Sequence, residues 1–400
     1  MFKLKTTLVI AFAIFATTFA RAEGSAISGA ADSSNLKEWT FLVFINGHNN
    51  LSSFADMNIK DMEKTGSSDK VNLVVEWGSQ SSKMTKRLLV KKSTNPSKVT
   101  SPVVMEMPNH DMGDYRNLID FVAWGVKNYP AKRYFVAVWN HGSGWHRTGK
   151  VSARDISFDD NTGNVITTEQ LGLAMQESAK IIGHNVDIYG SDACLMQMIE
   201  VGAEFNGSVD YMVGSQELEP GEGWPYAPFV KQWIANPTMT AAEVSVLLSK
   251  EYQKSYDGGV YGNKPDTTFS AVNLQKLPAL YASLTTLQQS LRGLGSAQFA
   301  EVKKAINNSM NFYYSDYVDL GDFLNRTQSL GFSRAIEGLS ASQSALKEVV
   351  LTADNGDNFL KASGLSIWLP TYQSSELNRY DNLQFSKTTG WNELVRQVLR

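Results

Sequence analysis

Cys194 is the only cysteine among the 400 residues of the chain. It lies in residues 186–196, whose pattern predicts a buried strand, a tight turn that exposes Asp192 and Cys194, and then a helix. Such a thiol is either a nucleophile, which must react as the thiolate, or a small hydrophobic residue of the core. With no second cysteine, no disulfide can form within the chain. Both interpretations remain open at this point.

A nucleophilic thiol needs a base close by. Among the five histidines, His141 is the best candidate, because it follows the predicted buried strand 134–139 and precedes Gly142. Glycine allows a backbone N–H to approach a reacting carbonyl, and the Cys194 N–H, expected at the start of a helix, would be the second donor of an oxyanion hole. A histidine that only bonds backbone in a turn fits the same pattern equally well.

The other histidines are weaker candidates. His48 also follows a predicted strand and is held in reserve, whereas His146 is expected at the surface. The chain has no Gly-x-Ser-x-Gly elbow, zinc motif, P-loop or dinucleotide-binding glycine pattern, so the chemistry needs no cofactor. Residues 159–163 resemble a calcium loop, but Gln170 occupies the twelfth position, where an EF-hand needs glutamate. A looser structural calcium site stays possible.

Three polar loops are expected at one edge of one sheet. Short apolar strands alternate with helical segments, which predicts an α/β fold with a mainly parallel sheet covered by helices on both faces. The loops that carry His141, Cys194 and residues 216–224 each follow a strand, and ligands collect at the carboxyl ends of such strands. The strands are expected at 39–45, 71–77, 87–90, 134–139, 186–190, 211–215, 267–273 and 364–369. The helices are expected at 115–129, 167–182, 240–256, 276–292, 298–309, 317–328 and 334–351.

The chain begins with an export signal. Lys3 and Lys5 precede an apolar run, and small residues at 20 and 22 fit a cleavage site after Ala22. Residues 23–35 form a polar leader. A core over 36–235 and a mostly helical part over 236–400, packed on the same sheet, complete the organisation. No second hydrophobic stretch follows, so no membrane span is expected, and the final location is periplasm, cell surface or medium.

The net charge gives no reason to expect a nucleic-acid partner. Cleavage after Ala22 removes three basic residues and no acidic one, which leaves 34 basic and 40 acidic side chains and a formal net charge of −6. The cluster of basic residues at 83–98 is expected to lie on a solvated ribbon of strands rather than in an anion site.

The order and spacing of several short motifs resemble the clostripain family of cysteine endopeptidases, which belongs to the caspase-like clan. These motifs are Asn-His-Gly after one strand and Asp-Ala-Cys about fifty residues later. Asn-Asn-Leu at 49–51, Glu-Pro-Gly at 219–221 with Trp224, and Asp-Leu-Gly-Asp-Phe at 319–323 are also similar. The likeness covers residues 36–400, and it implies a caspase-like three-layer sandwich with a helical C-terminal extension.

The resemblance also implies roles for individual residues. His141 would be the general base and acid, Cys194 the nucleophile, and the N–H groups of Gly142 and Cys194 the oxyanion donors. Asp192 would lie in the S1 pocket and pair with a P1 arginine or lysine, with Glu222 as a second contact. The alternatives are a helix N-terminal charge for Asp192 and a solvated loop charge for Glu222.

Family members are made as zymogens that cut themselves between the two catalytic residues. Here residues 147–155 are polar and contain glycine, and they offer Arg154, Lys150 and Arg147 as P1 residues, with Arg154 preferred. The expected product is a monomer or a self-cleaved two-chain form that acts on protein and peptide substrates. Two alternatives remain: a catalytically silent binding module, and the same dyad with another P1 preference.

Overall fold

The computed structural model describes residues 36–80, 84–146 and 155–400. The predicted export signal and leader, and the predicted processing residues Arg147, Lys150 and Arg154, lie outside these ranges. Residues 36–400 form one compact unit, and strands from both sides of residue 235 join its sheet. Within the described ranges, no helix is long and apolar enough to cross a membrane.

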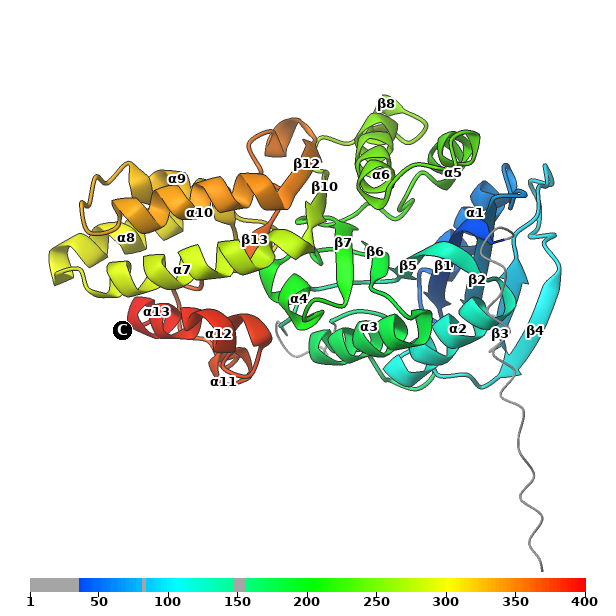
Figure 1. The fold of residues 1–400 in the computed structure, drawn as a ribbon, viewed down its shortest axis with the longest axis horizontal. Helices are drawn as coiled ribbons and strands as arrows, with labels where there is room; N and C mark the ends of the chain where they lie inside the picture. The colour runs from blue at the N-terminus through cyan, green and yellow to red at the C-terminus, as the bar shows by residue number, and fades with distance from the viewer. Residues whose placement is uncertain (1–35, 81–83, 147–154) are drawn as a thin grey trace, which may run out of the picture. The chain divides into compact units, whose positions relative to one another are not determined.

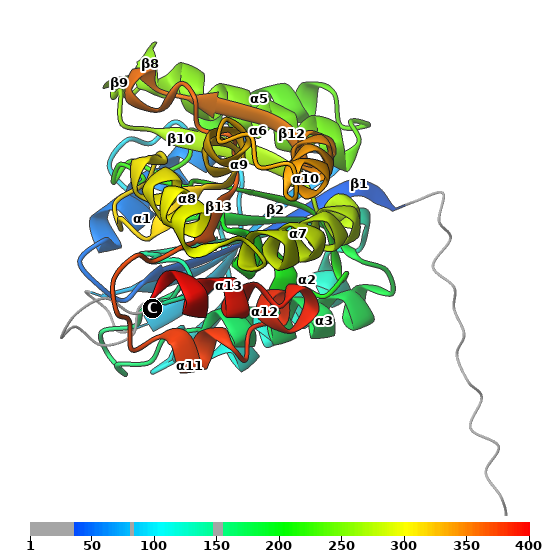
Figure 2. The same cartoon turned by 90° about the vertical axis from the view of Figure 1, so that its left-hand side faces the viewer.

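The centre of the described part is a nine-stranded sheet with the order β12-β10-β7-β6-β5-β1-β2-β3-β4 (Figures 1 and 2). The five middle strands from β7 to β2 run parallel, and the two strands at each side are antiparallel, which confirms the predicted mainly parallel sheet. In chain order the strands are β1 (Lys37–Gly47), β2 (Val71–Ser79), β3 (Met84–Leu89), β4 (Val103–Pro108), β5 (Ala131–Trp139), β6 (Val186–Asp192), β7 (Val209–Gly214), β10 (Thr268–Asn273) and β12 (Val350–Asn355).

The middle strands are apolar along their whole length because both faces of the sheet are covered. In β1, Leu42 and Phe44 pack into one hydrophobic cluster, whereas Phe41, Val43 and Ile45 pack into a second cluster on the opposite face. This alternation follows from the two-residue period of a strand. The sheet therefore separates two cores.

Helices form the outer layers (Figure 1). Residues of α1, α5 and α6 join the cluster of Phe41, and those of α2, α3 and α4 join the cluster of Leu42. The Thr167 side chain caps α3 in a capping box with Gln170. These helices are α1 (Ser52–Glu63), α2 (Tyr115–Asn128), α3 (Thr168–Ile182), α4 (Ile199–Glu204), α5 (Tyr226–Ala235) and α6 (Ala241–Tyr256).

The C-terminal part is mostly helical and extends the cluster of Leu42 (Figure 2). Two short antiparallel pairs accompany it: β8 (Asp257–Gly259) with β9 (Gly262–Asn263), and β11 (Tyr317–Asp319) with β13 (Ser366–Trp368). The helices are α7 (Leu277–Arg292), α8 (Ser296–Asn308), α9 (Leu320–Gln328), α10 (Ile336–Val349), α11 (Leu377–Tyr380), α12 (Gln384–Thr389) and α13 (Trp391–Val398).

Two strands of the nine-stranded sheet were not predicted, and the predicted helix 317–328 begins as strand β11 before α9 starts at Leu320. The predicted helix 334–351 ends at Val349, and the chain continues as edge strand β12. Strand β4 was not predicted; its Val103, Val104 and Met105 are 45%, 44% and 36% exposed, so it lacks the buried apolar pattern of a strand. Strands β3 and β4 pair as an edge ribbon, but of the described basic residues at 83–98 only Lys86 and Arg87 lie in a strand, whereas Lys91, Lys92 and Lys98 lie in the segment between the two strands. Arg87 is buried and pairs with Glu76 at 2.6 Å.

Parallel strand order places the site. Strands β1, β5, β6 and β7 are neighbours and run in one direction, so the segments after them gather at the same edge of the sheet. These segments begin at His48, Asn140, Ala193 and Ser215.

Candidate active site

The thiol of Cys194 lies in a tight turn just beyond β6. Leu195 adopts a left-handed φ of 65°, which is strained for a branched residue, and its N–H donates to the Glu217 carbonyl at 3.1 Å. Helix α4 starts only at Ile199, so the prediction that Cys194 begins a helix is wrong. The Glu217 contact holds the turn against the segment after β7. Because Cys194 lies several residues before α4, the dipole of this helix does not act directly on the sulfur.

The sulfur is covered by the segment after β7. The Glu219 N–H donates to Cys194 Sγ at 3.2 Å. Burial raises the pKa of the Cys194 thiol, the negative charges of Glu217 and Asp192 add to this rise, and the Glu219 N–H opposes it. The neutral thiol is therefore favoured in this arrangement, and formation of the thiolate requires a base that accepts its proton.

His141 follows β5 directly, as predicted. Its Nε2 lies 2.7 Å from Asn50 Oδ1, which can only accept a hydrogen bond. Nε2 therefore carries the proton, and Nδ1 keeps the lone pair that a general base needs.

The His141 turn and the Cys194 turn touch through Gly142. A Cβ at Gly142 would lie 2.4 Å from the Cys194 carbonyl oxygen, closer than side-chain carbons approach backbone. β5 and β6 pair in parallel up to Trp139 and Asp192, which aligns the two turns side by side. The structure thus brings together His141, Gly142 and Cys194, the three residues that the sequence selected for the reaction.

Asn49 fixes the loop that carries Asn50. Its Oδ1 accepts the Leu51 N–H at 2.9 Å, and its Nδ2 donates to the Phe158 carbonyl at 2.9 Å. Asn50 itself is exposed, so the loop presents its side chain to His141 while the neighbouring backbone stays fixed. The sequence showed these residues only as an Asn-Asn-Leu motif and gave Asn50 no role.

The other histidines bind elsewhere. His48 is buried and pairs with Asp159 at 2.8 Å, so the reserve candidate holds two loops together. His146 is also buried, 3.2 Å from Asp316, and the expectation that it lies at the surface is wrong. His110 contacts Glu76, and His184 lies 3.8 Å from Asp187.

Asp192 ends β6 and is buried beneath residues 219–226. Its Oδ2 accepts the Tyr226 hydroxyl at 2.7 Å and the Trp224 N–H at 3.3 Å. Burial raises the pKa of Asp192 to about 7. Asp192 therefore does not sit at a helix N-terminus, which was the alternative interpretation from the sequence.

Glu219 is a second buried carboxyl at this place. Its carboxyl lies against that of Asp192 and contacts the Trp224 side chain. Burial raises its pKa well above the usual range, and the charge of neighbouring Asp192 raises it further. Two buried carboxyls in contact do not ionise together readily, because their charges repel. Glu-Pro-Gly at 219–221 was noted in the sequence, but nothing there indicated that this side chain is buried.

Glu222, the other predicted S1 residue, pairs with Lys264 at 2.5 Å. Partial burial raises its pKa, but the hydrogen bond from Lys264 outweighs this, and the net pKa is lowered. Glu222 is thus an ionised, paired side chain in this arrangement.

Asp155 marks where the described chain resumes after residue 146. It is buried, and its carboxyl accepts the Thr168 N–H at 2.8 Å and the guanidinium of Arg379 at 2.5 and 3.1 Å. Arg379 also bonds Glu169. A cut at the Arg154–Asp155 bond would therefore require Asp155 to leave this contact.

In the calcium-like loop, protein donors occupy the carboxylate of Asp159. The Asp159 carboxylate accepts N–H groups from Met112 and Asn161 and bonds His48. In the described ranges, no group of three or more His, Cys, Asp or Glu side chains could hold a metal ion.

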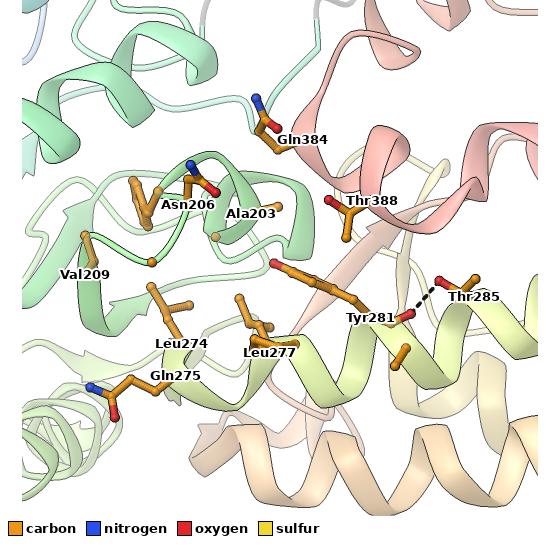
Figure 3. A pocket seen from close by; sticks show the side chains of 15 residues that line it. Ala203, Asn206, Val209, Leu274, Gln275, Leu277, Tyr281, Thr285, Gln384 and Thr388 are labelled. Atoms are coloured by element: carbon orange, nitrogen blue, oxygen red, sulfur yellow. Dashed lines mark hydrogen bonds between the residues drawn. The ribbon is translucent and has the colours of Figure 1, made fainter.

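A cavity of about 520 Å³ lies between α4, α7 and α12 (Figure 3). Val209, which lines it, begins β7, so the cavity is at the amino-terminal edge of the sheet, opposite Cys194. It is therefore separate from the His141–Cys194 turns.

The sequence profile of the clostripain family, Peptidase_C11, matches residues 43–397. The chain belongs to the clostripain family. Clostripain from Hathewaya histolytica is 24% identical over 309 residues, which cover 65% of this chain and 57% of clostripain. The match thus spans little more than half of clostripain's own length.

Two solved structures of C11 proteases, members of the clostripain family, share the fold. A secreted C11 cysteine protease from Bacteroides thetaiotaomicron, in complex with an irreversible peptide inhibitor, gives a TM-score of 0.67 at 21% identity over 89% of this chain and 99% of its own. An inactive zymogen C11 protease from Parabacteroides distasonis gives 0.66 at 20% identity over 88% and 98%. The clostripain-type fold implied by the sequence is confirmed.

Proposed function

We propose that this chain is an exported cysteine endopeptidase that hydrolyses peptide bonds after arginine or lysine. One observation carries the proposal: Gly142 packs against the Cys194 backbone, so that the His141 turn and the thiol turn meet at the carboxyl ends of β5 and β6. Membership of a family of cysteine peptidases supports the same chemistry.

The reaction uses the two turns in sequence. His141 Nδ1 takes the thiol proton, and Cys194 Sγ attacks the P1 carbonyl to give a tetrahedral oxyanion. The N–H groups of Gly142 and Cys194 stabilise this oxyanion, and each such donor is typically worth about 3 kcal/mol of barrier. His141 then protonates the leaving amine, and water, activated by the same imidazole, releases the acyl group.

Asp192 provides the preference for a basic P1 residue, with Glu222 as a second contact. A buried carboxylate such as that of Asp192 costs desolvation free energy when it is ionised alone. A substrate guanidinium that reaches it can form two hydrogen bonds with it and offset this cost. Glu222 must exchange Lys264 for the substrate to take part. Asp192→Asn and Glu222→Gln, tested separately, assign the two contacts, because each removes one charge at constant shape.

Arginyl and lysyl fluorogenic peptides test the activity. The wild type should cleave both, and Cys194→Ala and His141→Ala should each lose almost all activity. Glutamyl and leucyl peptides of the same length are the matched controls, and cleavage of these at equal rates contradicts the P1 preference. Activity that persists in Cys194→Ala contradicts the mechanism.

Export and self-processing belong to the same proposal. The positively charged, apolar start of the chain supports export, as does the secreted relative. The relative described as an inactive zymogen supports cleavage after Arg154, Lys150 or Arg147. N-terminal sequencing of wild type and Cys194→Ala protein should find Glu23 at the start of both. A second terminus within 148–155 should appear in the wild type alone.

A catalytically silent binding module is the second candidate. It is favoured by the covered sulfur and by the raised pKa of the Cys194 thiol. An arginyl chloromethyl ketone distinguishes the two, since an active dyad is alkylated at Cys194 and a silent one is not.

A further inference from the structure

A pocket of about 660 Å³ opens next to the thiol, within the usual range for ligand sites. Three loops and one short turn form its wall: residues 217–220 after β7, 263–267 before β10, 311–313 before β11, and Phe359. None of the residues assigned to the reaction lines it.

The pocket is continuous with the reacting atoms. Glu219, which lines it, donates its N–H to Cys194 Sγ at 3.2 Å, and the carbonyl of Glu217 accepts the Leu195 N–H. On the other side, Lys264 lines the pocket and bonds Glu222 at 2.5 Å. The pocket therefore adjoins both the sulfur and the proposed P1 contact. A peptide whose P1 side chain approaches Glu222 carries its preceding residues past this opening.

Six of the thirteen lining residues are apolar or aromatic, and part of this apolar surface is exposed. Phe312 and Phe359 pack with ring centroids 5.6 Å apart, and Pro220 and Pro265 contribute further apolar surface. Tyr313 is 61% exposed and Leu218 is 39% exposed. Large apolar side chains that remain exposed around a concavity are typical of a surface that a partner covers.

The charges at the rim are already engaged. Lys264 bonds Glu222, the Asp266 carboxylate accepts the Asn358 amide at 2.6 Å, and Glu217 accepts the Leu218 N–H at 2.7 Å. The Glu219 carboxyl is buried against that of Asp192. The aromatic wall is thus the part of the pocket left for a ligand, which favours an aliphatic or aromatic group over a charged one.

We propose that this pocket binds an aliphatic or aromatic side chain of the substrate at P2, P3 or P4, and so adds a second specificity site to the enzyme. An extended peptide advances about 3.3 Å per residue. The pocket begins beside Cys194 Sγ, so the side chain of a residue one to three positions before P1 can reach it. The inference rests on the proposed peptidase function and extends it beyond P1.

The test uses peptides of acetyl-Ala-Ala-Ala-Arg carrying a fluorogenic leaving group. Leu or Phe replaces each alanine in turn, and kcat/KM is measured with the self-processed full-length protein. One position should show a gain of about tenfold or more, the scale on which hydrophobic pockets discriminate. In Tyr313→Ala this gain should fall to about threefold or less, while the all-alanine peptide is cleaved within twofold of wild type.

Two further variants sharpen the result. Leu218→Asp places a charge at the exposed rim and should shift the preference at that position from Leu toward Lys. Tyr372→Ala removes a similarly exposed tyrosine, 51% exposed, that does not line the pocket, and it should keep the wild-type gain.

The outcomes separate the two proposals. Cleavage of all peptides at similar rates, or a preference that Tyr313→Ala and Leu218→Asp leave unchanged, overturns the pocket and leaves the P1 specificity standing. If no arginyl peptide is cleaved at all, the peptidase proposal fails, and the pocket assignment fails with it.

Discussion

His141 Nε2 donates a hydrogen bond to Asn50 Oδ1 over 2.7 Å. The two residues are 91 positions apart and come from the loops after β5 and β1, which are neighbouring strands. Because an amide oxygen only accepts hydrogen bonds, this contact favours the tautomer with the proton on Nε2 and the lone pair on Nδ1. Asn50 is thus a positioning residue for the histidine.

Asn50→Ala should lower kcat/KM by about 10- to 100-fold, the scale expected when a catalytic group loses its orientation. Because Asn50 is exposed, the thermal midpoint should change little. Asn50→Asp should shift the histidine limb of the pH–rate profile to higher pH, since a carboxylate stabilises imidazolium. The pH dependence of Cys194 alkylation by iodoacetamide checks this shift without a peptide substrate. Asp192, Glu217 and Glu219 also place carboxyl groups near the thiol. These groups are present in every variant, so they do not account for a difference between the pH profiles.

Ser53→Ala is the control for Asn50. Ser53 is exposed near the same loop, and its replacement should leave rate and pH profile unchanged. If Asn50→Ala matches wild type in both, the tautomer is fixed by other contacts of His141, and the positioning role is wrong.

The residues that we propose for the reaction could be selected from the sequence because each lies just after a continuous apolar run. Parallel strands place such residues at one edge, which explains why His141, Gly142 and Cys194 were found together. The sheet itself was predictable from the same runs, whereas β4 and β12 were missed because edge strands lack a fully buried pattern.

What the sequence could not show depends on contacts between distant segments. Arg379 meets Asp155 across 224 residues, and no local pattern pairs them. Glu222 and Glu219 look alike in the sequence, as acids of one loop, yet Glu222 pairs with Lys264 while the Glu219 carboxyl is buried against that of Asp192. Whether such a loop side chain is buried depends on how the loops pack against one another, and the spacing of residues in the sequence does not show this.

Gly142→Ala should abolish activity. The added methyl would lie 2.4 Å from the Cys194 carbonyl oxygen, so one of the two catalytic turns must move. A shift of about 1 Å at a reacting centre can cost about 100-fold in rate. Gly295→Ala is the control, because Gly295 has open space at its Cβ position and is remote from both turns. Peptide hydrolysis and circular dichroism of both variants give the result, and a Gly142→Ala enzyme with wild-type kcat contradicts the packing described.

Arg379→Met should destabilise the protein by about 3–5 kcal/mol, the scale for removing one partner of a buried ion pair. It leaves Asp155, which is fully buried, without its charge partner. Arg116→Met is the control, since its guanidinium is exposed and pairs with Asp114 at the surface, where such pairs contribute little. Urea unfolding of the Cys194→Ala background, which avoids self-cleavage, measures both. Equal midpoints for the two variants would show that the Asp155 contact is dispensable.

Cation binding at Asp192 should depend on pH in a defined direction. Burial raises the pKa of Asp192 to about 7, so below that pH the free enzyme holds the carboxyl protonated. An arginine-like inhibitor such as agmatine binds the ionised form and must displace this proton. Its inhibition constant should therefore fall by up to about tenfold per pH unit as pH rises toward 7, and level off above it.

In Asp192→Asn the inhibitor should bind at least about tenfold more weakly, with a flat dependence over pH 5–8. Glu222→Gln keeps the titrating group and should retain the wild-type slope. A wild-type inhibition constant that is constant over pH 5–8 would show that Asp192 does not bind the cation.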